Sequence, residues 1–171
     1  MSASLSRDSS SAPSLPNRRP SIVSSTSRPR QIIETTRVGS LGTLDEAGNP
    51  FVSLVTVAAL EPTRLILLLS GLAQHTQAIS ENPNVSLMIA EADTGKENPQ
   101  QLARLSVVGR AHTLATQAPQ YPAARQAYLV KYPQAALMFG LGDFRLVSVV
   151  PHGARLVAGF GKAFDLSPAQ L

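Results

Sequence analysis

The sequence contains no cysteine and no tryptophan among its 171 residues. Without thiols, the chain can form neither a disulfide nor a thiolate metal site nor a cysteine nucleophile. No uninterrupted apolar run is longer than residues 65–69, which is far shorter than the ~20 residues of a membrane-spanning helix. The N-terminus also lacks the apolar core of a signal peptide. We therefore predict a cytoplasmic protein without a membrane span.

An excess of basic residues is confined to one end of the chain. Residues 1–30 hold five of the 15 Lys and Arg residues and one of the 11 acidic residues, so residues 31–171 carry no net charge. A nucleic-acid-binding domain is expected to carry its basic patch on the folded part. We therefore predict no nucleic-acid partner.

The first 28 residues are rich in Ser, Pro and Arg. They have too few apolar side chains to offset the entropy that ordering would cost. Their acid-poor composition also resembles an organellar transit peptide, but the prolines disfavour the amphipathic helix of such a peptide. We predict a disordered basic tail over residues 1–28 and one folded domain over residues 29–171.

Apolar segments separated by turn residues indicate an antiparallel β-protein. The predicted strands cover 38–44, 51–60, 64–69, 85–90, 102–114, 144–150 and 154–158. We expect the first three strands to form a meander. The last two should form a hairpin around Pro151, His152 and Gly153, and Gly109 should mark a β-bulge.

Helices are predicted over residues 30–37, 72–81 and 119–132. The order of helices and strands contains no strand–helix–strand repeat of the kind that builds a parallel sheet. The predicted fold class is therefore mainly β (α+β): an antiparallel split β-barrel of about six to seven strands with short helical insertions.

Residues of the common catalytic motifs are missing. The three histidines, at positions 75, 112 and 152, are far apart and have no carboxylate at metal-ligand spacing. The sequence also has no nucleophile elbow and no phosphate-binding Gly-Lys-Ser/Thr loop. We predict no metal site and assign no catalytic residue, so an enzyme with this sequence would need a cofactor for its chemistry.

One segment, residues 65–83, combines a buried strand with the start of a helix. It delivers Ser70, Gln74, His75 and Thr76 to the helix N-terminus. Backbone N–H groups and the helix dipole favour an anion such as phosphate at that position. An alternative interpretation is that Ser70 only caps the helix.

Four segments resemble the pyridoxamine-phosphate-oxidase-like, FMN-binding split-barrel superfamily, and most closely its haem-utilisation (haem oxygenase-like) branch. The most specific parts are the Ser-x-Leu-Ala-x-His-Thr pattern that begins at Ser70 and the Gly-Phe-Gly sequence that begins at Gly159. The matching segments are 42–44 with 48–53, 69–76, 104–109, and 143–144 with 159–163.

This resemblance implies an FMN-binding flavoprotein that forms a homodimer, with the cofactor between the two protomers. It further implies an FMN-dependent oxidoreductase with an unknown small-molecule substrate. Residues implied to lie along the flavin ring and ribityl chain are Ser53, Leu54, Val55 and Thr56. Residues implied to hold the phosphate are Ser70, Gln74, His75 and Thr76. The resemblance places Arg104 against the flavin and lets Lys162 approach from the other subunit.

A departure from the superfamily pattern leaves alternatives open. The Arg that should follow a Tyr at four-residue spacing is absent, because the nearest match is Tyr128 with Tyr132. Oxidation of vitamin B6 is therefore not expected. The first alternative is binding or degradation of haem, although His152 is expected to be an exposed loop residue rather than a ligand. The second is a cofactor-free dimeric interaction module whose basic tail docks on an acidic partner.

Overall fold

The computed structural model describes residues 23–60, 63–96, 98–159 and 161–171, with side chains from Arg28 onward. The prediction for residues 1–22 and the match at Phe160 therefore fall outside the described residues. The helices are α1 (Val23–Thr35), α2 (Gln74–Glu81) and α3 (Tyr121–Lys131). The strands are β1 (Val38–Leu44), β2 (Pro50–Thr56), β3 (Ala58–Leu60), β4 (Arg64–Ser70), β5 (Asn84–Ala90), β6 (Arg104–Thr113), β7 (Phe144–Val157) and β8 (Ala163–Leu166).

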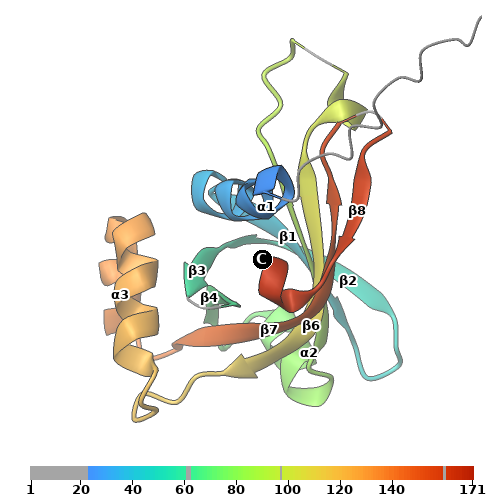
Figure 1. Cartoon of the computed structure of the whole chain (residues 1–171). Coiled ribbons are helices and arrows are strands. Elements are labelled where there is room, and N and C mark those ends of the chain that lie inside the picture. Colours follow the sequence, from blue (N-terminus) through green and yellow to red (C-terminus); the bar gives the residue numbers. More distant parts are fainter. Residues whose placement is uncertain (1–22, 61–62, 97, 160) are drawn as a thin grey trace, which may run out of the picture.

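All strands belong to one antiparallel sheet of eight strands in the order β2-β1-β5-β6-β7-β4-β3, with β8 added beside β7. The sheet curls so strongly that its two end strands, β2 and β3, are joined by the single residue Val57 (Figure 1). The place where Val57 joins the two end strands of the sheet is called the seam below. The covalent chain connects the ends there, rather than hydrogen bonds between paired strands. The predicted split antiparallel barrel is confirmed.

The seam corrects two predictions. Residues 51–60 are not one strand, because the chain breaks at Val57 and β3 joins the opposite end of the sheet. The expected meander is also wrong, since β1 pairs with β2 and β5, whereas β4 pairs with β3 and β7. Apolar composition alone could not reveal the break, since Val57 is apolar and buried like Val55 before it and Ala58 after it.

The predicted C-terminal hairpin is wrong as well, because β7 is one strand of 14 residues. Its register with β6 shifts between Val108 and Gly109, which face Gly153 and Pro151, so that His152 is left without a cross-strand partner. A bulge is a position where a strand tolerates the missing N–H of proline. The bulge expected at Gly109 is confirmed, and His152 is exposed within a strand rather than in a turn.

The helices differ from their predicted bounds mainly at the N-terminus of the domain. α1 begins at Val23 rather than at residue 30, so the expected boundary between residues 28 and 29 falls inside this helix. α2 begins at Gln74, two residues later than predicted. β8 was not predicted at all, because its four residues alternate poorly between buried and exposed.

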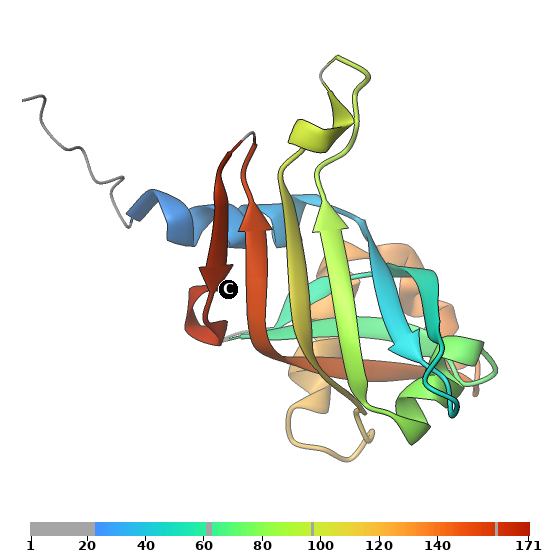
Figure 2. The ribbon, with the colours of Figure 1, turned by 90° about the vertical axis from the view of Figure 1, so that its right-hand side faces the viewer.

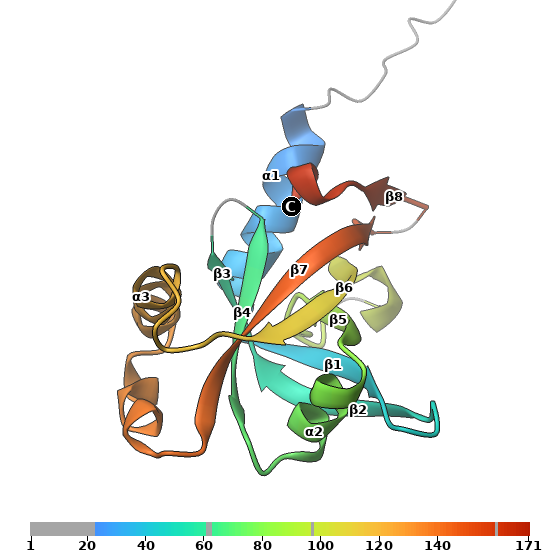
Figure 3. The ribbon, with the colours of Figure 1, turned by 90° about the horizontal axis from the view of Figure 1, so that it is seen from below.

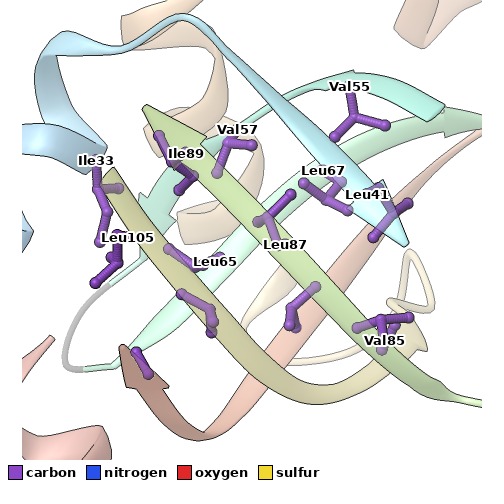
Figure 4. Packing of buried hydrophobic residues seen from close by; sticks show 14 of the residues in the cluster. Ile33, Leu41, Val55, Val57, Leu65, Leu67, Val85, Leu87, Ile89 and Leu105 are labelled. Carbon is purple, nitrogen blue, oxygen red and sulfur yellow. The ribbon is translucent and has the colours of Figure 1, made fainter. Parts of the chain in front are cut away.

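Apolar side chains fill both faces of β4. Leu65, Leu67 and Leu69 point into the space enclosed by the sheet, where they meet side chains from α1 and the facing strands (Figure 4). Ile66 and Leu68 point the other way, into a second cluster beneath α3. The prediction that this strand is buried on both faces is confirmed. Seen from below, α2 lies beside β1 and β2, and α3 lies on the other side of β4 (Figure 3).

None of the helices in the described part of the chain has the length and apolar character needed to cross a membrane.

Candidate functional site

A hollow of about 300 Å³ lies where β2, β4, α2 and α3 approach one another. It is referred to below as the β2–β4 hollow. Its walls are mainly apolar, with a few hydroxyl groups and one imidazole. The lining residues are Val38, Leu54, Val55, Thr56, Leu68, Leu69, Ser70, Ala73, His75, Tyr128, Met138 and Phe144.

His75 and Ser53 meet at the edge of this hollow although they are 22 residues apart. The Nδ1 atom of His75 lies 2.9 Å from the Oγ atom of Ser53. Burial lowers the pKa of His75 below its usual range, so the imidazole is neutral at pH 7. If Nδ1–H donates to Ser53, the Nε2 atom keeps its lone pair for a ligand or a metal ion.

The hydroxyl groups of Ser70 and Thr76 already have partners within the protein. Ser70 donates to Oδ2 of Asp143 at 2.7 Å, and Thr76 donates to the Ser70 carbonyl at 2.7 Å. The Leu72 N–H donates to the Ser70 hydroxyl, while the N-cap residue of α2 is Ala73. Ser70 therefore does not cap the helix. Instead, its hydrogen bond to Asp143 connects the end of β4 to the residue that precedes β7. The negative charge of the Asp143 carboxylate beside it disfavours the binding of a phosphate.

Thr56 and Tyr128 close the hollow on the side of α3, and their hydroxyl groups are hydrogen-bonded to each other. Burial raises the pKa of Tyr128, so its phenol stays protonated at neutral pH. Sequence reasoning missed Tyr128 and Asp143 as parts of the site. The available signal was the spacing of Tyr128 and Tyr132, which places both on one face of a helix.

The remaining predicted residues divide into three groups. Leu54 lines the β2–β4 hollow with its side chain exposed, and Val55 lines it from the core side. Gln74 does not join them, because it borders a separate hollow with the acidic residues Asp45, Glu46 and Glu81. The third group, Arg104 and Lys162, lies elsewhere in the sheet.

Arg104 and Lys162 lie at the opposite end of β7 from the hollow. Arg104 pairs with Val157, and the Lys162 carbonyl accepts from Ala158, whereas Ser70 pairs with Phe144. At ~3.3 Å per strand residue, Phe144 and Val157 are ~40 Å apart along the strand. Figure 2 shows this separation, with the β7–β8 turn at one end of the sheet and α2 at the other. One protomer therefore does not unite all the predicted site residues.

The curled antiparallel sheet, whose two end strands are joined at the seam, defines the chain as a split β-barrel. Residues 20–170 match the family described as "CREG, beta-barrel", and the chain belongs to this family. The resemblance predicted from the sequence is confirmed.

Three relatives illustrate this relationship. A chloroplastic protein of Arabidopsis thaliana named non-canonical heme oxygenase HOZ is 30% identical over 137 residues, which cover 79% of this chain and 40% of the relative. A heme binding protein from Mycobacterium smegmatis is 27% identical with a TM-score of 0.78, covering 89% of this chain and 60% of that one. A protein of the pyridoxinephosphate oxidase family from Clostridium acetobutylicum is 14% identical with a TM-score of 0.60, covering 83% and 93%. The chain thus spans less than half the length of the curated relative.

Proposed function

We propose that the protein binds haem in the β2–β4 hollow, with His75 as the ligand of the iron. The observation that supports this most directly is the neutral His75 imidazole, held through Nδ1 by Ser53 at the edge of an apolar hollow. Iron takes neutral imidazole, and a hydrogen bond at the other ring nitrogen is what orients such a ligand. The two relatives of highest identity described above also carry haem in their names.

The residues of the hollow fit haem in two further respects. Leu54, Val55 and Phe144 offer apolar surface to a planar macrocycle, and Thr56 and Tyr128 offer hydroxyl groups. Bound haem would supply iron for storage or for oxygen-dependent chemistry. A hollow of about 300 Å³ is at the lower end of the range for ligand sites, so one protomer covers only part of the macrocycle.

A second copy of the chain would supply the rest of the site. The outer face of the sheet carries two rows of cross-strand neighbours, and each row combines exposed apolar side chains with small residues. The rows are Leu54, Ser40, Met88 and Ser106, and Val52, Gly42, Ser86 and Val108. Leu54 is 74% exposed and Val52 is 65% exposed. Such an exposed apolar face is typical of a self-association surface.

Pairing across this face would also explain the position of Arg104. Arg104 is on the same outer face, at the far end from the hollow, and Lys162 lies in the turn beside it. A twofold axis that lies in this face and crosses the strands would turn the far end of one protomer toward the near end of its partner. The partner would then contribute cations for the acidic groups of a cofactor, either haem carboxylates or a phosphate.

FMN is the second candidate, and its binding would make the protein a flavin-dependent oxidoreductase. The favouring observation is that residues 53–56 of β2 run beside the hollow, as the superfamily resemblance predicts for a flavin. Against it stands the engagement of Ser70 and Thr76 with internal partners, which leaves the phosphate dependent on the partner's cations.

A titration of the purified full chain with hemin tests the proposal. We expect a saturable shift of the Soret band, lost or weakened at least tenfold in His75→Ala. The variant His112→Ala is the matched control, because His112 is an exposed histidine that does not line the hollow. Equal hemin binding by both variants would refute the role of His75. Saturable quenching of FMN fluorescence without a Soret response would favour the flavin instead.

A further inference from the structure

Val57, the single residue of the seam, is held by the end of α3. It is 1% exposed and takes part in no strand ladder within the described chain. Its N–H donates to Oη of Tyr132 at 3.1 Å, and its carbonyl accepts from Nζ of Lys131 at 2.7 Å. Lys131, the last residue of α3, and Tyr132, which follows it, therefore satisfy the carbonyl and the N–H group of a buried residue that pairs with no strand in the described chain.

The same two side chains also reach the beginning of the domain. Lys131 donates to the Ile33 carbonyl in the last turn of α1 at 2.5 Å. The Tyr132 hydroxyl donates to the Arg37 carbonyl at 2.5 Å and shares the same proton with the Val57 carbonyl at 2.9 Å. Lys131 and Tyr132 thus tie together α1, the start of β1 and the seam.

The seam is directly connected to the β2–β4 hollow. Thr56 precedes Val57 in the chain and is hydrogen-bonded to Tyr128, one helical turn before Tyr132. Thr56 and Tyr128 both line the hollow. A displacement of Val57 would therefore move the hydroxyl-bearing wall of the candidate cofactor site.

Lys131 is the group of this cluster that titrates closest to neutral pH. The pKa of Lys131 is lowered to about 8, chiefly by desolvation and also by the charge of Arg37, while the charge of Glu34 acts in the opposite direction. The Arg37 guanidinium and the Lys131 ammonium lie 5.1 Å and 5.6 Å from the centre of the Tyr132 ring. Burial raises the pKa of Tyr132 and of Tyr128, so neither phenol ionises in the range where Lys131 does.

We propose that Lys131 and Tyr132 form a clamp on the seam, which positions the wall of the β2–β4 hollow and loosens when the Lys131 ammonium loses its proton. An ammonium makes charge-assisted hydrogen bonds to the Ile33 and Val57 carbonyls, and these are about twice as strong as those of a neutral amine. The clamp itself is independent of the ligand. Its effect on binding rests on the proposed function.

Amide hydrogen exchange at Val57, followed by NMR on the full chain without ligand, tests the clamp. In Tyr132→Phe and in Lys131→Met, we expect this amide to exchange at least tenfold faster than in the wild type, while Leu87 in the β5 ladder is unchanged. Tyr121→Phe and Lys162→Met are the matched controls, because neither side chain reaches the seam. Unchanged exchange at Val57 in Tyr132→Phe would overturn the proposal.

The pH dependence distinguishes a positioning role from a general structural one. After correction for base-catalysed exchange, protection at Val57 should fall in the wild type as the pH rises through about 8. Lys131→Arg keeps its charge, so its protection should stay constant between pH 7 and pH 9. A wild-type profile without a step would contradict the role of Lys131 protonation.

Hemin titrations at pH 7 and pH 9 then connect the clamp to the site. We expect wild-type affinity to decrease several-fold at pH 9, Lys131→Met to bind weakly at both values, and Lys131→Arg to bind equally at both. Failure of the wild type to bind hemin at either pH would refute the proposed function alone, since the exchange experiment has no ligand. If wild-type hemin affinity were the same at pH 7 and pH 9 although exchange at Val57 changed as expected, the clamp would not influence the hollow.

Discussion

Replacement of Gly109 by alanine should destabilise the barrel more than its single added methyl group suggests. Gly109 sits at the bulge between β6 and β7, where an ideal Cβ would lie 2.4 Å from the Val150 carbonyl oxygen and 3.0 Å from Cα of Pro151. Ordinary carbon–oxygen contacts are ~3.3 Å or longer, so the two strands would have to separate by almost 1 Å. Both contacted atoms belong to the backbone and cannot turn away as a side chain can.

The magnitude of this effect follows from the cost of overpacking. Extra methyl groups in packed interiors cost ~1–3 kcal/mol, and we expect a value near ~3 kcal/mol because a strand ladder must shift. For a chain of this size, each kcal/mol lowers the melting temperature by ~2–4 °C, which gives a decrease of ~6–12 °C. The control is Gly140→Ala, since nothing lies within 4 Å of a Cβ at that position.

Thermal unfolding followed by circular dichroism, with urea unfolding as a second measurement, checks this prediction. The Gly109→Ala protein should unfold at clearly lower temperature and urea concentration, whereas Gly140→Ala should stay close to the wild type. If both variants melted within ~2 °C of the wild type, the close approach of β6 and β7 at the bulge would be wrong.

Three further predictions concern the site and the outer face. Hemin affinity should decrease only when the pH falls below the usual imidazole range, because the lowered pKa keeps His75 neutral until then and protonation blocks its ring nitrogen below it. A hemin affinity that does not change between pH 4.5 and pH 7 in Soret titrations would argue against His75. Ser70→Ala should lower the free energy of unfolding by ~1–2 kcal/mol in urea, because Asp143 loses its hydroxyl donor, and an unchanged midpoint would contradict that contact. Leu54→Arg should convert the proposed dimer to a monomer in light scattering, and an unchanged mass would exclude the outer face as the interface.

Strand positions were predictable where one face of a strand is buried. β5 and β6 alternate between buried and exposed residues along their length, which is the pattern that sequence reasoning detects. The break at Val57 and the continuity of β7 through Pro151 were not predictable, because both depend on partners. Val57 obtains its hydrogen bonds from α3, and Pro151 is accommodated by a register shift in β6.

The candidate site was predictable in part for the same reason. The superfamily resemblance placed Ser53 and His75 in one site, and the structure brings them to 2.9 Å. It also grouped Gln74 with them, yet Gln74 turns toward an acidic hollow on the other side of α2. Which way a helical residue points depends on how the helix lies on the sheet, and a short helix without a side-chain cap carries little local information on this.

The length of β7 has a consequence for the way in which this domain unfolds. Val147 and Val149 belong to the cluster enclosed by the sheet, whereas Leu146, their neighbour on the same strand, belongs to the cluster beneath α3. Neither cluster can lose its contacts without disturbing a strand on which the other depends. The two clusters should therefore melt as one cooperative unit, with equal calorimetric and van't Hoff enthalpies, although they lie on opposite faces of the sheet.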